Sequence, residues 1–222
     1  MATATAPGQT CRNFINGEWV PSRSPRSVER RNPANRDEVV AVVPLSSAEE
    51  ARDAVAAARA AFPAWREVPA PARGRILARA AHVMEQQKDK LARLLTREEG
   101  KTFKDALGEV IKSVRVLEFM SGEGTRLGGD TLPSDLPKNF VYTIKQPLGV
   151  VAAITPWNFP VSIPVWKIAP AIVAGNTVVL KPSTYTSLTA AAILELFAEA
   201  GLPPGVVNMV VGSGSEAGGA II

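Results

Sequence analysis

Two kinds of hydrophobic pattern divide this chain: helical spacing in its first part and short, continuous apolar runs in its last third. Ser47 and Glu50 form a capping box, which predicts the start of an alanine-rich helix. Pro63 is expected to end that helix, because proline lacks the N–H that a helix interior needs, and Pro71 can start the next one. Two more helical stretches follow: residues 71–100, broken near Lys88, and residues 103–127, stopped by Gly128-Gly129.

Strands are predicted on both sides of these helices. Residues 14–20 form a tight hairpin, since Asn16-Gly17 suits the two positive-φ positions of its turn, and residues 140–145 alternate like a strand. Three later runs have the continuous apolar character of buried parallel strands: residues 150–154, 177–180 and 206–211. This order predicts an α/β fold with a doubly wound, Rossmann-like parallel sheet, preceded by helices and binding ligands at the carboxyl ends of its strands.

The last residues predict a sheet that is incomplete at the C-terminus. The segment from Glu216 begins another helix and stops on Ile221 and Ile222 without a polar tail. Three parallel strands are fewer than the usual five or six, so apolar faces and a sheet edge are expected to stay uncovered. The sequence therefore favours a truncated or split product.

Composition and charge exclude several classes of protein. The chain has 222 residues, 46% hydrophobic and 21% charged, as a globular domain has. Its formal charge of +4 is scattered, and the one short basic run, residues 23–31, is interpreted as a solvated loop, so no nucleic-acid partner is expected. Residues 1–10 lack the pattern of a secretion signal, and no apolar stretch is long enough for a membrane helix. We expect a cytoplasmic protein.

Two side chains with reactive groups do not indicate a site. Cys11 is the only cysteine, so no internal disulfide is possible, and its place in a loose N-terminal arm argues against a nucleophile. His82 has no companion Cys, His or acidic residue at metal-ligand spacing. We predict no metal site.

The first late apolar run leads into Thr155-Pro156-Trp157-Asn158-Phe159-Pro160. Prolines on both sides of Asn158 fix the backbone, and a donor aimed at developing oxyanion charge must be held in this way. Alternatively, the Asn158 amide satisfies backbone groups of its own loop.

The other two runs also end in candidate ligand-binding residues. Lys181 is followed by Pro182, Ser183 and Thr184, so that an ammonium and two hydroxyls could hold ribose or phosphate, although a lysine that ends a strand can also simply face solvent. The Gly-rich turn of residues 212–218 would let a ligand approach backbone at a helix N-terminus. Its third glycine is one place late for the dinucleotide fingerprint, so a plain turn is an equal alternative.

Together these segments resemble the aldehyde dehydrogenase superfamily, and the resemblance covers nearly the whole chain. The matching segments are residues 154–160, Trp166-Lys167, 175–177, 181–183 and 201–218, with 16–19, 32–33, 99–101 and 128–133 upstream. Within the family, the chain looks most like enzymes that act on 2,5-dioxopentanoate, also called α-ketoglutarate semialdehyde. Succinate semialdehyde and betaine aldehyde stay open as substrates.

The resemblance implies oxidation of an aldehyde to a carboxylic acid: a cysteine attacks the carbonyl, hydride passes to nicotinamide, and a glutamate activates water. Asn158 matches the side-chain oxyanion donor. The matches to cofactor and substrate positions are Ile154, Thr155, Pro156, Trp157, Lys181, Ser183, Thr184, Gly214, Ser215 and Gly218 for NADP or NAD, and Phe159, Ile163 and Trp166 for the substrate tunnel. Simple core packing is the alternative for the last three.

The chain departs from the family pattern at two points. Thr184 stands where many NAD-using members have a glutamate, which would bind both ribose hydroxyls and repel a 2′-phosphate. We therefore predict that NADP is accepted at least as well as NAD. The positions of the family's glutamate base and cysteine lie beyond Ile222, so the chain alone is expected to be inactive.

The resemblance also implies a division of the chain. Residues 1–137 would be the N-terminal arm, hairpin and helices of the cofactor-binding domain, residues 138–147 the first strand of an oligomerisation sheet, and residues 148–222 a truncated βαβαβ core, with no catalytic domain. Full-length members are homo-oligomers that take small-molecule aldehydes. An acyl-phosphate reductase, which the Pro-Trp-Asn-Phe-Pro loop argues against, and a non-catalytic dinucleotide-binding remnant remain alternatives.

Overall fold

A five-stranded sheet in the order β3-β2-β10-β9-β8 forms the centre of the computed structural model, which describes residues 9–222. Most of the segment examined for a secretion signal, residues 1–8, lies outside the described residues. The sheet's strands are β8 (Val150–Ile154), β9 (Thr177–Lys181), β10 (Val207–Met209), β2 (Asn13–Ile15) and β3 (Glu18–Val20). The three predicted parallel strands and the Asn16-Gly17 hairpin, with positive φ at both residues, are confirmed.

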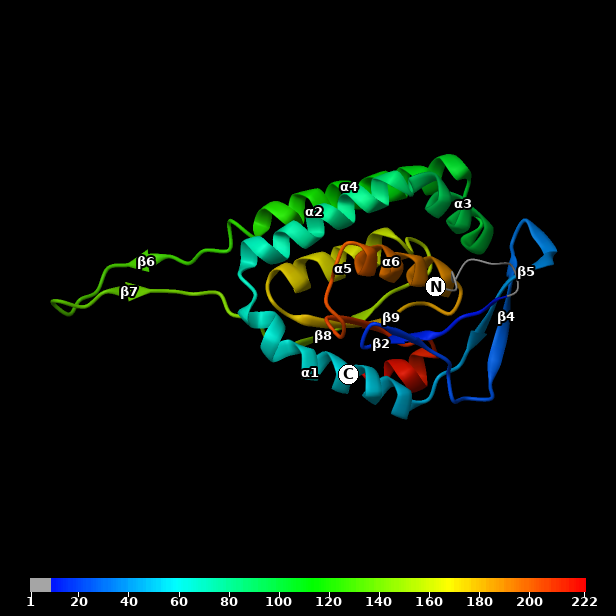
Figure 1. The fold of residues 1–222 in the computed structure, drawn as a ribbon, viewed down its shortest axis with the longest axis horizontal. Helices are drawn as coiled ribbons and strands as arrows, with labels where there is room; N and C mark the ends of the chain where they lie inside the picture. The colour runs from blue at the N-terminus through cyan, green and yellow to red at the C-terminus, as the bar shows by residue number, and fades with distance from the viewer. Residues whose placement is uncertain (1–8) are drawn as a thin grey trace.

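Helices cover both faces of this sheet (Figure 1). One face carries α1 (Ala48–Glu67) and the π-helical turn η1 (Gly214–Gly218); the other carries α5 (Ser162–Val173) and α6 (Ser187–Glu199). An outer layer of α2 (Ala70–Gln86), α3 (Lys88–Glu99) and α4 (Phe103–Glu123) packs on α5 and α6. This is the doubly wound α/β arrangement that the sequence predicts. Within residues 9–222, no helix is both long and apolar enough to cross a membrane.

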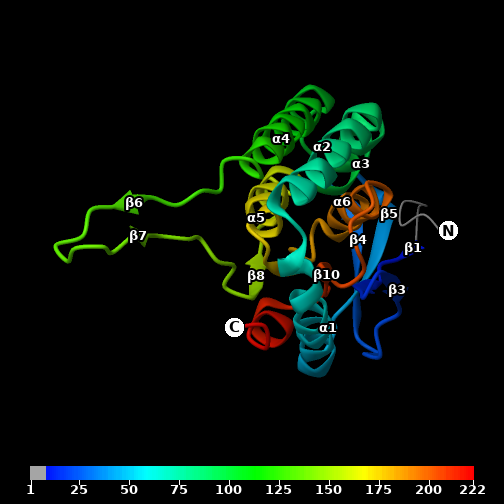
Figure 2. The same cartoon turned by 60° about the vertical axis from the view of Figure 1, so that its left-hand side comes forward.

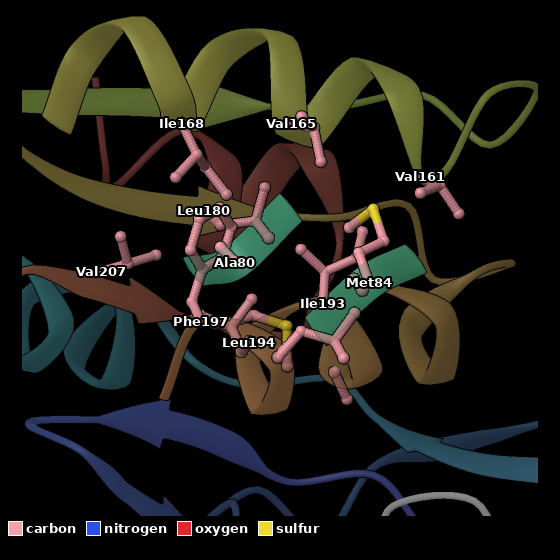
Figure 3. Packing of buried hydrophobic residues seen from close by; sticks show 14 of the residues in the cluster. Ala80, Met84, Val161, Val165, Ile168, Leu180, Ile193, Leu194, Phe197 and Val207 are labelled. Atoms are coloured by element: carbon pink, nitrogen blue, oxygen red, sulfur yellow. The ribbon is translucent and has the colours of Figure 1, made fainter. Parts of the chain in front are cut away.

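One large hydrophobic core joins the sheet to α5, α6 and the outer helices, and a second, smaller cluster packs α1 and η1 against the opposite face. Leu180 of β9 and Val207 of β10 meet Phe197 of α6 and Ile168 of α5, and Met84 reaches the same cluster from α2 (Figure 3). Burying a side chain of this size stabilises a fold by roughly 1.5–3 kcal/mol. The outer helices are therefore part of the same folding unit as the sheet.

Two smaller sheets complete the fold. β1 (Gln9–Thr10), β5 (Asn35–Pro44) and β4 (Ser27–Asn32) form one, with a turn at Asn32–Asn35 between β4 and β5. β6 (Thr131–Leu132) and β7 (Val141–Tyr142) form a hairpin that projects far from the body (Figure 2). The prediction of a strand over residues 140–145 is thus wrong in length, because only Val141 and Tyr142 pair as strand residues with the opposite arm.

Pro63 does not end α1, contrary to the sequence prediction. The helix continues to Glu67, with Pro63 in its interior. Trp65 in the last turn is 2% exposed, and its indole N–H donates to the Ile172 carbonyl at 3.2 Å. Burial of this large side chain outweighs the hydrogen bond that proline removes. The capping box at Ser47 and Glu50 is confirmed.

Three other expectations about local structure are wrong in whole or in part. Cys11 does not lie in a loose arm, because β1 pairs with β5 and the Cys11 N–H donates to the Val42 carbonyl at 2.8 Å; its side chain is 2% exposed. The basic run is only partly a loop, since its last residues belong to β4. The helix predicted over residues 103–127 ends at Glu123, where Gly124 approaches α2 too closely for a side chain.

Candidate functional site

The segments that follow the three parallel strands meet at one edge of the sheet. Ile154 pairs with Lys181 in the strand register, and the Thr155 N–H donates to the Lys181 carbonyl at 3.1 Å. On the other side of β9, the Val210 N–H donates to the Leu180 carbonyl at 3.0 Å. The carboxyl ends of β8, β9 and β10 thus bring the Asn158 loop, the Lys181 segment and the Gly-rich turn together.

Lys181 lies buried between two of these segments. Its ammonium donates to the carbonyls of Pro182 at 2.6 Å and Gly212 at 3.2 Å, and its stem runs beside Gly218. Burial lowers the pKa of Lys181. Among the described residues no carboxylate pairs with it, so the ammonium can still bind a hydroxyl or an anion.

The two hydroxyl residues after Lys181 have different surroundings. Ser183 Oγ accepts the Tyr185 N–H at 3.2 Å and shapes the turn. Thr184 is held by Arg30 of β4, whose Nε donates to the Thr184 carbonyl at 2.9 Å and whose Nη2 donates to Thr184 Oγ1 at 2.8 Å. The Arg30 guanidinium also stacks on the Tyr185 ring, 4.2 Å from its centroid. Sequence reasoning missed this cation, which lies 154 residues away in the chain.

The Gly-rich turn is capped but short. Ser213 Oγ accepts the Glu216 N–H at 3.1 Å, and the π-helical turn η1 follows. A Cβ at Gly214 would meet nothing within 4 Å, so the backbone there is open to a ligand. Gly214 and Ser215 are exposed, whereas Gly218 is buried.

Asn158 lies exposed in the loop between β8 and α5. Among the described residues its side-chain amide has no hydrogen-bond partner, so the alternative that it satisfies backbone groups of its own loop is wrong. Its backbone carbonyl accepts a hydrogen bond from Lys101 Nζ at 3.0 Å. The hydroxyl of Thr155, just before the loop, is buried and has no partner. Unused donors therefore lie at this strand end.

The loop also faces the segment after β9. Trp157 and Tyr185 line the same hollow of about 530 Å³, together with Arg30 and Glu98. Pro156 and Ile154, the remaining cofactor candidates, lie at the loop's start and at the end of β8.

The candidate substrate residues are not gathered into one pocket. Phe159 is 46% exposed beside Lys101, and Ile163 is half-buried on α5. Trp166, 41% exposed, lines a separate hollow of about 300 Å³ with Lys112 and residues of α4, and neither Phe159 nor Ile163 lines it. The three residues lie on α5 or in the loop directly before it.

A doubly wound α/β fold with cationic and hydroxyl groups at its strand ends defines the class of dinucleotide-binding enzymes. The profile of the aldehyde dehydrogenase family matches residues 19–222, and the chain belongs to that family.

Several relatives resemble the chain closely. It is 48% identical over 206 residues to an alpha-ketoglutaric semialdehyde dehydrogenase of Bacillus subtilis, with 93% of this chain and 42% of the relative covered. It is 50% identical over 191 residues to a 2,5-dioxopentanoate dehydrogenase of Saccharolobus solfataricus, with 86% and 40% covered. The chain thus spans about two fifths of the length of these relatives.

A solved structure shares the fold. The crystal structure of an E. coli NADP dependent enzyme superposes with a TM-score of 0.91 at 42% identity, covering 94% of this chain and 43% of that one.

Proposed function

We propose that this chain supplies the dinucleotide-binding edge and the oxyanion donor for the NAD(P)-dependent oxidation of an aldehyde to a carboxylic acid. The observation that carries the proposal is the Asn158 amide, which has no hydrogen-bond partner within residues 9–222 and lies at the same sheet edge as the Lys181 ammonium, which donates to two backbone carbonyls and to no carboxylate of those residues. An amide N–H held there stabilises the negative charge on the carbonyl oxygen when a nucleophile adds to an aldehyde. When bound, NAD(P) accepts the hydride that leaves the carbonyl carbon.

Residues from all three strand ends would hold the dinucleotide. Lys181, Ser183 and Thr184 would bind the adenosine ribose, because the ammonium is buried and, in the described part of the chain, has no carboxylate partner. Residues 154–157 would border the cofactor along the end of β8. Gly214, Ser215 and Gly218 would pack against adenine, since the backbone at Gly214 is open and the Lys181 stem passes Gly218.

NADP is the cofactor that the surroundings of Thr184 favour. A threonine hydroxyl does not repel a 2′-phosphate as a carboxylate would, and the Arg30 guanidinium lies 2.8 Å from that hydroxyl. The similar E. coli structure is that of an NADP dependent enzyme, which supports this choice. NADP should bind at least as tightly as NAD.

Calorimetric titration of the purified chain with NADP and with NAD tests the proposal. Lys181→Met keeps the side-chain length and removes the ammonium, so it should weaken binding roughly ten- to a hundredfold, the effect of losing a hydrogen bond from a charged group. Lys145→Met, in the exposed segment before β8, should bind like the unaltered chain. Failure to bind either dinucleotide would contradict the proposed dinucleotide site. A strong preference for NAD would contradict the proposed acceptance of NADP.

The substrate is proposed to be a semialdehyde such as 2,5-dioxopentanoate, which the names of the Bacillus and Saccharolobus relatives support. Phe159, Ile163 and Trp166 would form part of its path. We expect no aldehyde oxidation by the 222-residue chain itself, because its only cysteine, Cys11, is buried and burial raises the pKa of its thiol. Steady NAD(P)H production by the purified chain would refute this.

The projecting β6–β7 hairpin is proposed as the contact of a homo-oligomer. Its exposed apolar side chains, Leu132, Leu136, Phe140, Tyr142 and Ile144, support an interface role.

A further inference from the structure

We propose that Lys101 and Glu109 are positioning residues that hold the loop of residues 155–160 in the conformation that presents the Asn158 amide. The inference rests on the proposed role of Asn158 as the oxyanion donor. Both positioning residues come from the region where α4 begins, more than forty residues before the loop in sequence. Their contacts reach the loop itself and the first residues of the helix that follows it.

The backbone of the loop makes few hydrogen bonds. Pro156 and Pro160 have no N–H to donate. The Thr155 N–H donates to the Lys181 carbonyl of β9. The Ile163 N–H, in the first turn of α5, donates to the Phe159 carbonyl at 3.0 Å. Between these two points, the one hydrogen bond that ties the loop to the rest of the described structure is that of Lys101 Nζ to the Asn158 carbonyl, 3.0 Å long.

Lys101 is itself fixed by a buried carboxylate. Its Nζ lies 2.5 Å from Glu109 Oε2, and the side chains of Lys101 and Glu109 are 13% and 1% exposed. The other oxygen of Glu109, Oε1, accepts the N–H groups of Val161 and Ser162 at 2.8 and 3.0 Å. One carboxylate thus anchors both the start of α5 and the ammonium that binds the loop. Charge-assisted hydrogen bonds of this kind are short and strongly directional.

Lys101 also contacts Phe159, the next residue of the loop. The Phe159 ring lies over Lys101 Nζ, with 4.6 Å between the nitrogen and the ring centroid. The ammonium therefore binds the carbonyl of Asn158 and the side chain of Phe159 together. With its carbonyl and its neighbour both held, the backbone of Asn158 has little freedom to rotate, so the Cα from which its side chain projects keeps its place. Preorganised donors stabilise an oxyanion better than mobile ones.

Nuclear magnetic resonance relaxation on the 222-residue chain tests this arrangement without substrate. The backbone amides of Trp157, Asn158 and Phe159 are the probes. In the unaltered chain their order parameters should be near the rigid-backbone value of about 0.85, and in Lys101→Met they should fall below about 0.6. Lys101→Arg keeps the charge and several donors, so it should restore most of the lost order.

Lys112→Met is the matched control. Lys112 lies on α4 and, like Lys101, has its ammonium over an aromatic ring, with Nζ 4.7 Å from the centroid of Trp166 on α5, but within residues 9–222 it makes no hydrogen bond to the loop. Its removal should leave the loop amides unchanged. If Lys101 only packed α4 on α5, Lys101→Met would disturb amides throughout α5. If Lys101 positions the loop, the loss of order in Lys101→Met is confined to the loop.

A second measurement needs no variant and remains decisive if Lys101→Met does not fold. A scalar coupling across the hydrogen bond should join Lys101 Nζ to the carbonyl carbon of Asn158 in the unaltered chain. Absence of this coupling, or unchanged loop order in a folded Lys101→Met, would overturn the positioning role. Either result would leave the oxyanion role of Asn158 standing, because neither measurement involves an aldehyde or a dinucleotide.

Discussion

Glu98 should make the stability of this protein fall as the pH rises through the weakly acidic range. Its carboxylate is fully buried at the end of α3 and accepts the Leu188 N–H at 2.7 Å and the Thr189 N–H and hydroxyl at 2.7 and 2.6 Å. Burial nevertheless raises the pKa of Glu98 from 4.5 to about 7, since desolvation of the charge outweighs these donors.

The sign and size of the effect follow from that shift. Between pH 4.5 and about 7 the folded chain binds the Glu98 proton and the unfolded chain releases it, so the free energy of unfolding decreases as the pH rises. The stabilisation is fully present below the unfolded pKa and is lost above the folded one. At about 1.4 kcal/mol per pKa unit, the loss amounts to about 3 kcal/mol.

Urea unfolding followed by circular dichroism measures this loss against Glu98→Gln, which cannot titrate. The unfolding free energy of the unaltered chain, relative to that of the variant, should fall by about 3 kcal/mol from about pH 4.5 to about pH 8. Glu67→Gln, which removes an exposed carboxylate at the end of α1, serves as the control for surface charge. Parallel curves for the unaltered chain and Glu98→Gln would refute the reasoning.

Two further predictions concern the first part of the chain. Cys11 should resist thiol reagents in the native chain and react once per molecule in denaturant, because it is 2% exposed and burial raises the pKa of its thiol; rapid native labelling would show the burial to be wrong. Ser47→Ala should lower the unfolding free energy by about 1 kcal/mol in urea, because it removes the hydroxyl that caps α1, whereas Ser47→Thr should lose less. Equal losses would speak against the cap.

Much of the candidate site was visible in the sequence because its residues stand directly after the strands that place them. Strand ends are readable from continuous apolar runs, and parallel strands of this fold class bring their carboxyl ends to one edge. Asn158, Lys181 and the Gly-rich turn were found in this way. The missed residues, Arg30, Lys101 and Glu109, act from elements that meet the site only through tertiary packing.

Local signals also failed wherever a distant contact was stronger. Proline chemistry predicted that α1 ends at Pro63, yet the burial of Trp65 against α5 carries the helix further. The polar start of the chain predicted a loose arm, yet pairing of β1 with β5 places Cys11 in the core. Ile172, which binds Trp65, and β5, which pairs with β1, both lie too far along the chain for a local sequence pattern to reveal them.

By itself, the sequence determined the helical and strand periods, the tight turn at Asn16-Gly17, the capped start of α1 and the order of elements that makes a doubly wound sheet, because short-range sterics and hydrophobic spacing decide these features. The tertiary structure alone decided that the N-terminal hairpin covers the β10 edge, that Arg30 meets Thr184 and that the Lys101–Glu109 pair holds the Asn158 loop. Such contacts join residues far apart in the chain, and their geometry exists only once the core has formed.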